Sequence, residues 1–185
     1  IQRFVETWSI LERLRDMDIL DTIIDGKDKF ISMGGGPGFE LYTIKLFMDM
    51  YRPKESKRFR YISIDLEPGW KDYALSMGIE FIPGTFDCHY MYDNSIFVFS
   101  YVTHQYIHDT DLFKNIIFSG NDILINERVP LHVLKSLELE NNKNINIYRL
   151  IKGHDLQTLI SNKNISIKYI DQLTFKNIPY IRKYT

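Results

Sequence analysis

A cluster of glycines between an apolar segment and a helical one is the feature that most constrains the fold of this chain. Gly34, Gly36 and Gly38 follow the apolar segment in a G-x-G-x-G spacing. A second apolar segment, residues 60–65, ends in Asp65. A strand, a glycine turn that opens a helix, and an acid after the next strand together make a nucleoside-binding βαβ unit. The sequence therefore predicts a nucleoside site at this turn.

The residues around the turn disfavour a dinucleotide. A dinucleotide fingerprint, G-x-G-x-x-G, needs a third glycine where this chain has Phe39, which is too large for close helix packing. Pro37 has no N–H to hold a phosphate, and Glu40 places a negative charge in the first helical turn, where a diphosphate would bind. We therefore expect a ligand without phosphate, and a nicotinamide- or flavin-dependent oxidoreductase is a minor alternative.

S-adenosylmethionine fits these conditions because it carries adenosine but no phosphate, and its sulfonium and amino groups are cationic. The segments resemble the motifs of the class I (Rossmann-like) S-adenosylmethionine-dependent methyltransferases, whose first motif is an apolar strand followed by G-x-G-x-G. In that family an acid after the second strand holds the ribose, which Asp65 matches, and an acid after the third strand meets adenine, which Asp87 matches. Ser32 stands where the family often has an acid, so Glu40 or a backbone carbonyl would hold the methionine amino group.

The resemblance implies a cofactor pocket at the ends of the strands. Its expected residues are Gly34, Gly36, Gly38, Glu40, Asp65, Leu66, Phe86, Asp87 and Ser100. A fainter likeness, limited to residues 31–70, is to a eukaryotic group of ribosomal-RNA base methyltransferases. This second likeness implies an RNA acceptor, an RNA-bound partner and a nucleolar or cytoplasmic place of work.

Methyl transfer from a sulfonium is an in-line displacement, so the enzyme chiefly fixes distance and angle, excludes water and needs no metal. A protonated amine or hydroxyl acceptor also needs a base, which we expect near the end of the fourth strand. The residues there, Ser-Tyr-Val-Thr-His-Gln-Tyr at 100–106, match neither the N/D-P-P-Y/F motif nor the Lys-Asp-Lys-Glu set of ribose methyltransferases. His104 is the first candidate for this base and Tyr101 the second, although His104 also fits a surface or packing histidine.

Alternating apolar and amphipathic segments predict an α/β fold: a mostly parallel Rossmann-like sheet with helices on both faces and a C-terminal antiparallel strand pair. We expect an N-terminal helix and turn at residues 1–26, packed on a single domain at 27–185. The expected strands are 29–33, 60–65, 80–83, 95–101 and 122–127, with a closing pair at 165–170 and 178–184. The expected helices of the domain are 39–51, 70–77, 104–115 and 130–140.

Charge and composition limit the partners. The net charge of −1 argues against bulk electrostatic binding of nucleic acid, although a basic run at 52–60 fits either a local RNA patch or a solvated loop. The single cysteine rules out an internal disulfide and is consistent with a reducing compartment. His104 and His108 stand four residues apart, but the H-E-x-x-H arrangement is missing, so we expect no metal.

The sequence has no apolar run of ~18 residues, and we therefore expect no membrane span and an intracellular protein, cytoplasmic or nuclear. RNA stands slightly ahead of a small molecule or protein side chain as the expected acceptor. The main rival is a catalytically silent nucleoside-binding domain that serves a partner subunit. A partner protein subunit is also one way in which the acceptor site of an active enzyme would be completed.

Overall fold

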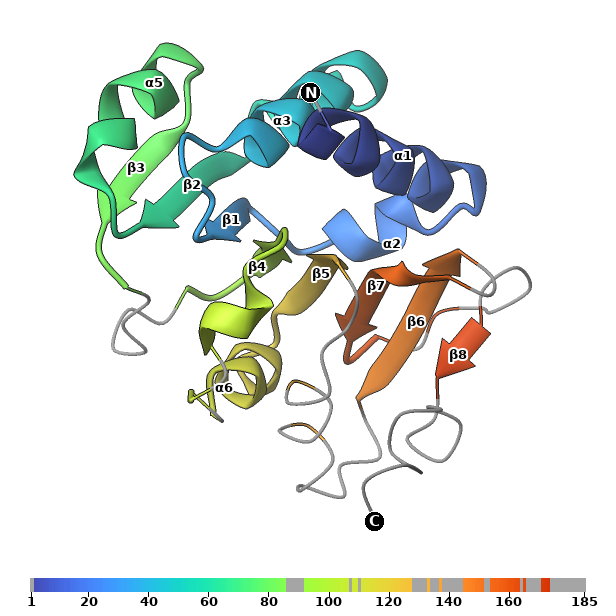
Figure 1. The fold of residues 1–185 in the computed structure, drawn as a ribbon. Coiled ribbons are helices and arrows are strands. Elements are labelled where there is room, and N and C mark those ends of the chain that lie inside the picture. Colours follow the sequence, from blue (N-terminus) through green and yellow to red (C-terminus); the bar gives the residue numbers. More distant parts are fainter. Residues whose placement is uncertain are drawn as a thin grey trace.

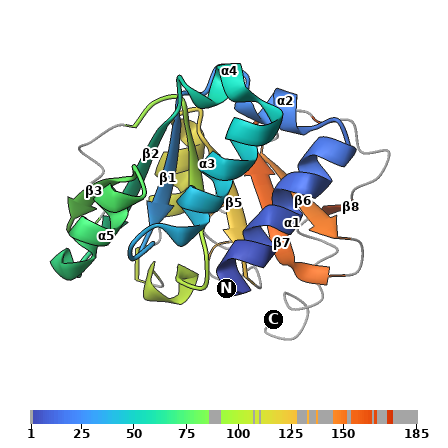
Figure 2. The same cartoon turned by 90° about the horizontal axis from the view of Figure 1, so that it is seen from above.

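One eight-stranded sheet with helices on both faces forms the centre of the fold (Figures 1 and 2). The strands lie across it in the order β3-β2-β1-β4-β5-β7-β6-β8. Their bounds are β1 Lys29–Met33, β2 Arg60–Asp65, β3 Glu80–Pro83, β4 Ser95–Phe99, β5 Asp122–Asn126, β6 Asn146–Ile151, β7 His154–Ser161 and β8 Asp171–Leu173. This computed structural model describes residues 2–85, 92–106, 108–109, 111–127, 133, 137, 145–151, 154–163, 165 and 171–173.

The helices divide between the two faces of the sheet. One face carries α1 and α3, which lie side by side, and α6 covers the other (Figures 1 and 2). The α-helices with described bounds are α1 Gln2–Asp16, α2 Leu20–Ile24, α3 Phe39–Tyr51, α4 Pro53–Ser56, α5 Lys71–Ser76 and α6 Leu112–Phe118. The described residues also form the short 3₁₀ helices η1 Pro68–Trp70 and η2 Thr103–Tyr106.

Strand direction confirms the predicted fold class. β1 to β5 pair in parallel, and the pairs β5–β7, β7–β6 and β6–β8 are antiparallel. This is the expected mostly parallel Rossmann-like sheet with antiparallel strands at its C-terminal side. The antiparallel pair β6–β7 lies earlier in the sequence than the predicted pair at 165–170 and 178–184, whose residues apart from Ile165 lie outside the described part of the chain.

Alternating side chains of the central strands fill two separate cores. In β1, Phe30 packs into the core under α1 and α3, whereas its neighbour Ile31 packs into the core under α6. In β4, Val98 and Phe99 divide in the same way. A strand buried on both faces has to be apolar at every position, which explains the continuous apolar runs in the sequence. Because β1, β2 and β4 are parallel, their carboxyl ends lie together at one end of the sheet. The strand order reverses between β1 and β4, so this end contains the topological switch point of the sheet.

The segment after β4 differs from the prediction. The expected strand 95–101 ends at Phe99, and the expected helix 104–115 is replaced by η2 and, after a turn, by α6. Tyr101 adopts a left-handed conformation with φ of 59°, which ends the strand. The Asp109 carboxylate accepts a hydrogen bond from the Leu112 amide at 3.1 Å, and such a side-chain partner favours a helix start at that point.

Two further helices were predicted from the sequence, one at the N-terminus and one at residues 130–140. The N-terminal helix is present as α1, which packs on α3. Of the predicted helix 130–140, the structure describes only Val133 and Leu137, both helical and buried. Across the described parts of the chain, none of the helices combines the length and apolar character that a membrane crossing requires.

Candidate functional site

The glycine turn leaves the carboxyl end of β1 and leads into α3. Gly34, Gly36 and Gly38 have φ of 61°, 56° and 82°, a conformation that side chains other than glycine rarely adopt. The Gly36 amide donates a hydrogen bond to Asp65 Oδ2 at 2.8 Å, and Ser63 Oγ donates one to the Gly36 carbonyl at 2.9 Å. The turn is thus fastened to the end of β2 by two contacts.

Gly35 lies between two glycines of the G-x-G-x-G motif, at a position that the motif leaves unspecified. It is the most tightly packed position of the turn. A Cβ at this residue would lie 2.3 Å from Ser32 Oγ and 2.9 Å from Ser63 Oγ. Both serines come from strands beneath the turn, so the backbone of Gly35 rests directly on the sheet. Sequence reasoning missed this requirement because it depends on two side chains that only the fold brings together.

Asp65 joins the turn to the cavity beside it. Its Oδ2 accepts from the Gly36 amide, and its Oδ1 accepts from the Glu67 amide at 2.9 Å. Each carboxylate oxygen has a second lone pair, so both oxygens can still accept from ligand hydroxyls. The Asp65 side chain therefore holds the glycine turn in place and can still accept hydrogen bonds from a ligand.

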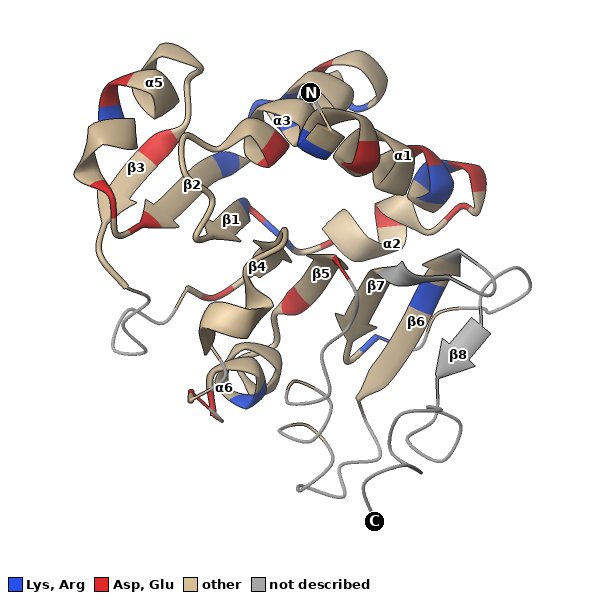
Figure 3. Ribbon diagram, in the orientation of Figure 1, with Lys and Arg blue, Asp and Glu red and all other residues tan. Residues whose placement is uncertain are grey.

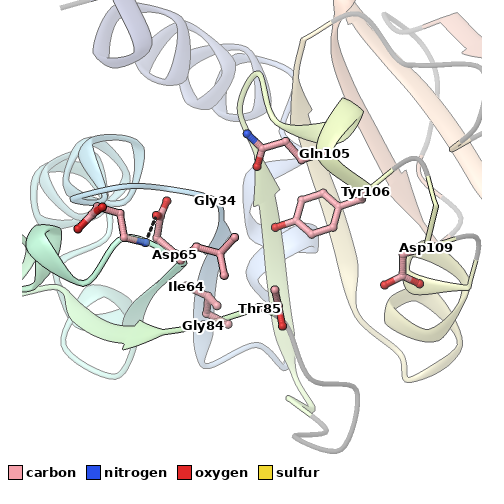
Figure 4. A pocket seen from close by; sticks show the side chains of 10 residues that line it. Gly34, Ile64, Asp65, Gly84, Thr85, Gln105, Tyr106 and Asp109 are labelled. Carbon is pink, nitrogen blue, oxygen red and sulfur yellow. Dashed lines mark hydrogen bonds between the residues drawn. The ribbon is translucent and has the colours of Figure 1, made fainter.

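A cavity of about 520 Å³ opens between the ends of β1, β2 and β3 on one side and the segment after β4 on the other (Figure 4). Its size is typical of sites for small molecules and cofactors. None of its described lining residues is Lys or Arg, whereas three of them are acids. The lining consists of Gly34, Ile64, Asp65, Leu66, Glu67, Gly84, Thr85, Gln105, Tyr106 and Asp109. Such a lining suits a cationic or neutral ligand and disfavours a phosphate.

The structure brings together several of the residues predicted from sequence. Gly34, Asp65 and Leu66 line the cavity, Gly36 binds Asp65, and Gly38 precedes the first residue of α3. Phe86 and Asp87, expected on the adenine side, lie outside the described residues. Ser100 is 1% exposed and does not line the cavity, and its Oγ has no hydrogen-bond partner among the described residues.

Glu40 lies beneath the glycine turn and does not line the cavity. Its side chain is 1% exposed, and Oε1 accepts a short hydrogen bond from Ser32 Oγ. Among the described residues Oε2 has no hydrogen-bond partner. Burial raises the pKa of the Glu40 carboxyl above its usual value, with the Ser32 hydrogen bond acting in the opposite direction. The carboxyl group thus adjoins Ser32, the position where the resembled family often carries its acid.

The two residues predicted as bases, Tyr101 and His104, lie outside the cavity lining. The Tyr101 hydroxyl donates to Glu6 Oε1 of α1 at 2.9 Å, and burial, followed by Glu6, raises its pKa. His104 is exposed on η2. His104 and His108 do not share one helix, because η2 ends at Tyr106 and the predicted helix 104–115 is not formed.

The far wall of the cavity is formed by residues that the sequence prediction did not assign to the cofactor. Gln105, Tyr106 and Asp109 extend from this wall, and the Tyr106 side chain points across the cavity (Figure 4). Tyr106 packs edge-on against Phe99 with ring centroids 5.7 Å apart, and burial raises the pKa of its hydroxyl to about 12. An aromatic residue close behind an apolar strand was the available signal, but the predicted helix 104–115 obscured it.

The basic run at residues 52–60 does not line this cavity. Arg52 pairs with Asp21 and Arg60 with Glu80, each at 2.6 Å. Arg60 is the first residue of β2, so the run lies at the opposite end of the strand from Asp65. In the portion of the chain that the structure describes, no three His, Cys, Asp or Glu side chains are grouped as metal ligands.

Comparison with known proteins yields structural likeness only. No family model matches the sequence, and no curated protein does. The plantazolicin methyltransferase BpumL, solved in complex with SAH, is 12% identical with a TM-score of 0.54, covering 87% of this chain and 85% of that one. WbdD, solved with a kinase inhibitor, is 14% identical with a TM-score of 0.54 over 85% of this chain and 41% of that one. The N-terminal domain of human METTL16, in complex with SAH, is 11% identical with a TM-score of 0.49 over 84% and 69%.

Proposed function

From the class I methyltransferase fold of this chain, we propose that it is an S-adenosylmethionine-dependent methyltransferase. The observation that carries the proposal is the acidic cavity at the switch point of the sheet, bordered by the glycine turn and by Asp65. A cationic sulfonium and an adenosine without phosphate suit this lining, whereas a pyrophosphate does not. The binding of SAH by BpumL, which shares the fold, supports the same ligand class.

We assign the residues in and around the cavity to different parts of the cofactor. Asp65 would accept the ribose hydroxyls, and Leu66 beside it would contact the adenosine. Glu40 would provide the negative charge near the methionine amino group from beneath the turn, where Ser32 donates a hydrogen bond to its carboxylate. We propose from the sequence alone that Phe86 and Asp87 contact the adenine and that Ser100 contacts the cofactor close behind β4.

The cofactor would supply a methyl group on a cationic sulfur. The chain's own part is then to hold the acceptor in line with that group and to exclude water. His104 is the proposed base for an acceptor proton because its neighbours Gln105 and Tyr106 line the cavity while its imidazole stays exposed. Tyr101 is the second candidate, although its hydroxyl is engaged with Glu6.

Two classes of acceptor for the methyl group are compatible with the proposal. RNA is the first class that the sequence indicates, and a small molecule or protein side chain is the second. The acidic lining and the remote position of the basic run support the second class, because phosphates would meet carboxylates at the entrance. Filter binding of RNA at two salt concentrations distinguishes the two acceptor classes, since affinity that rests on phosphate contacts falls steeply with salt.

The proposal is tested first by a thermal-shift panel with S-adenosylhomocysteine (SAH) and NAD. A ligand that binds the folded state raises the melting temperature. We expect SAH to stabilise the protein and NAD to have no effect. A larger response to NAD would favour an oxidoreductase, and no response to SAH would favour the silent scaffold.

A further inference from the structure

A group of exposed apolar side chains adjoins the cavity at the end of β2. Leu66, Trp70 and Tyr73 are 70%, 39% and 63% exposed, and all three come from the stretch that runs from β2 through η1 into α5. We call these three residues the aromatic platform. Single exposed apolar residues are common on protein surfaces, but several large ones beside a cavity mark an interaction site.

The platform is held in place by its own local contacts. The Trp70 and Tyr73 rings meet edge to face with centroids 6.1 Å apart. The Trp70 indole lies over the glycine turn, 3.7 Å from the place where a Cβ of Gly36 would be. Behind it, Glu67 Oε1 accepts from the Gly69 amide at 2.9 Å and fixes the turn into η1. A surface ordered before binding loses little entropy when a partner arrives.

The charges around the platform are mainly negative. The stretch 65–76 carries the carboxylates of Asp65, Glu67 and Asp72 and one ammonium group, that of Lys71. Figure 3 shows acidic positions at the carboxyl end of β2 and on α5. The adjoining cavity adds the Asp109 carboxylate. Exposed aromatic rings with nearby carboxylates attract Arg and Lys side chains through cation–π and ionic contacts, whereas they repel phosphates.

We propose that the aromatic platform is a docking surface for a polypeptide segment that carries Arg or Lys side chains, and that it brings this segment to the mouth of the cavity. The complementarity of charge and the two accessible rings select this occupant over an RNA strand. Because Leu66 and Glu67 also line the cavity, a segment seated on the platform lies next to the adenosine end of the proposed cofactor site. The docking itself does not require methyl transfer to occur.

Fluorescence anisotropy of dye-labelled probes with the full chain tests this surface. The probes are an Arg-Gly peptide, its Glu-Gly counterpart and a uridine-rich RNA of similar length. We expect the Arg-Gly peptide to bind about tenfold more tightly than either other probe at low salt. Tyr73→Ala should weaken its binding about threefold, and Asp72→Asn should reduce its dependence on salt.

The matched control is Phe118→Ala, because Phe118 is an apolar side chain on α6 that is 44% exposed and lies outside the platform. Equal binding of the acidic peptide, or Arg-Gly binding that Tyr73→Ala leaves unchanged, would overturn the proposal. RNA that binds more tightly than the peptide and loses affinity in Tyr73→Ala would also overturn it, in favour of a nucleic-acid surface. SAH stabilisation measured on the same variants keeps a failure of the platform distinct from a failure of the cofactor proposal.

Discussion

At the scale of single residues, Gly35 is the position of the glycine turn where a side chain has least room. A methyl group there would overlap Ser32 Oγ and Ser63 Oγ, which belong to strands rather than to flexible loops. Gly35→Ala should therefore lower the free energy of unfolding by about 1–3 kcal/mol in urea denaturation. Gly69→Ala is the comparison, because Gly69 also lacks a left-handed φ and a Cβ there would meet only the end of the flexible Glu67 side chain, at 3.0 Å. An equal or smaller effect of Gly35→Ala than of Gly69→Ala would contradict the close approach.

Glu40 provides a prediction on pH. Because its pKa is raised in the folded protein, the unfolded chain releases this proton first as the pH rises from about 4. Stability is therefore lost between the ordinary pKa of the carboxyl and its raised folded value, and the loss persists at higher pH. Glu40→Gln should melt at a higher temperature than the wild type at pH 8 and at a similar one at pH 4. A variant that is less stable than the wild type at pH 8 would show that the ionised carboxylate is stabilising there.

At the scale of elements, α1 is tied to the ends of two strands through one side chain. Glu6 Oε1 accepts from the Tyr101 hydroxyl at 2.9 Å, and Glu6 Oε2 accepts from Asn126 Nδ2 at 3.1 Å. Tyr101 is in a left-handed conformation, which is uncommon for a bulky residue and persists only when its surroundings hold it. The segment that follows carries Gln105 and Tyr106 into the cavity. The position of α1 and the shape of the far wall are thus coupled.

Tyr101→Phe removes the hydroxyl from this contact and leaves the ring. Because hydrogen bonds to charged groups are the stronger ones, we expect a loss of about 1–2 kcal/mol in the free energy of unfolding. Combined with Glu6→Gln in a double-mutant cycle, the two effects should sum to more than the double variant loses, since both disturb the Tyr101–Glu6 contact. Tyr73→Phe is the control, because the Tyr73 side chain is exposed. Additive effects in the cycle would contradict the coupling.

The elements also show what the sequence could predict. β1, α3, β2 and β3 begin and end at the predicted residues, because apolar runs, the glycine turn and Pro53 are local signals. The segment after β4 was predicted wrongly because tertiary contacts determine it, among them the hydrogen bond from the Thr103 amide to Glu127 Oε1 at 2.8 Å. The far wall of the cavity was missed for the same reason, since its residues belong to that segment.

At the scale of the whole molecule, charge separates the two ends of the sheet. The carboxylates of Asp65, Glu67 and Asp109 border the cavity, whereas the basic run 52–60 precedes and enters β2 at its other end. The small net charge of −1 conceals this separation, because the separation depends on which strand ends meet in the fold. A cationic ligand is therefore drawn to the carboxyl end of the sheet, where the fold also places the glycine turn.

The most direct test of this account is calorimetric titration of SAH into the wild type and into Asp65→Ala. We expect a dissociation constant in the micromolar range, about −8 kcal/mol, for the wild type. Removal of the carboxylate should weaken binding by about tenfold, which corresponds to the loss of a hydrogen bond to a charged group. Asp72→Asn, a change in an exposed acid of α5, should leave the affinity unchanged. No binding to the wild type, or equal affinity in Asp65→Ala, would contradict a cofactor site at this turn.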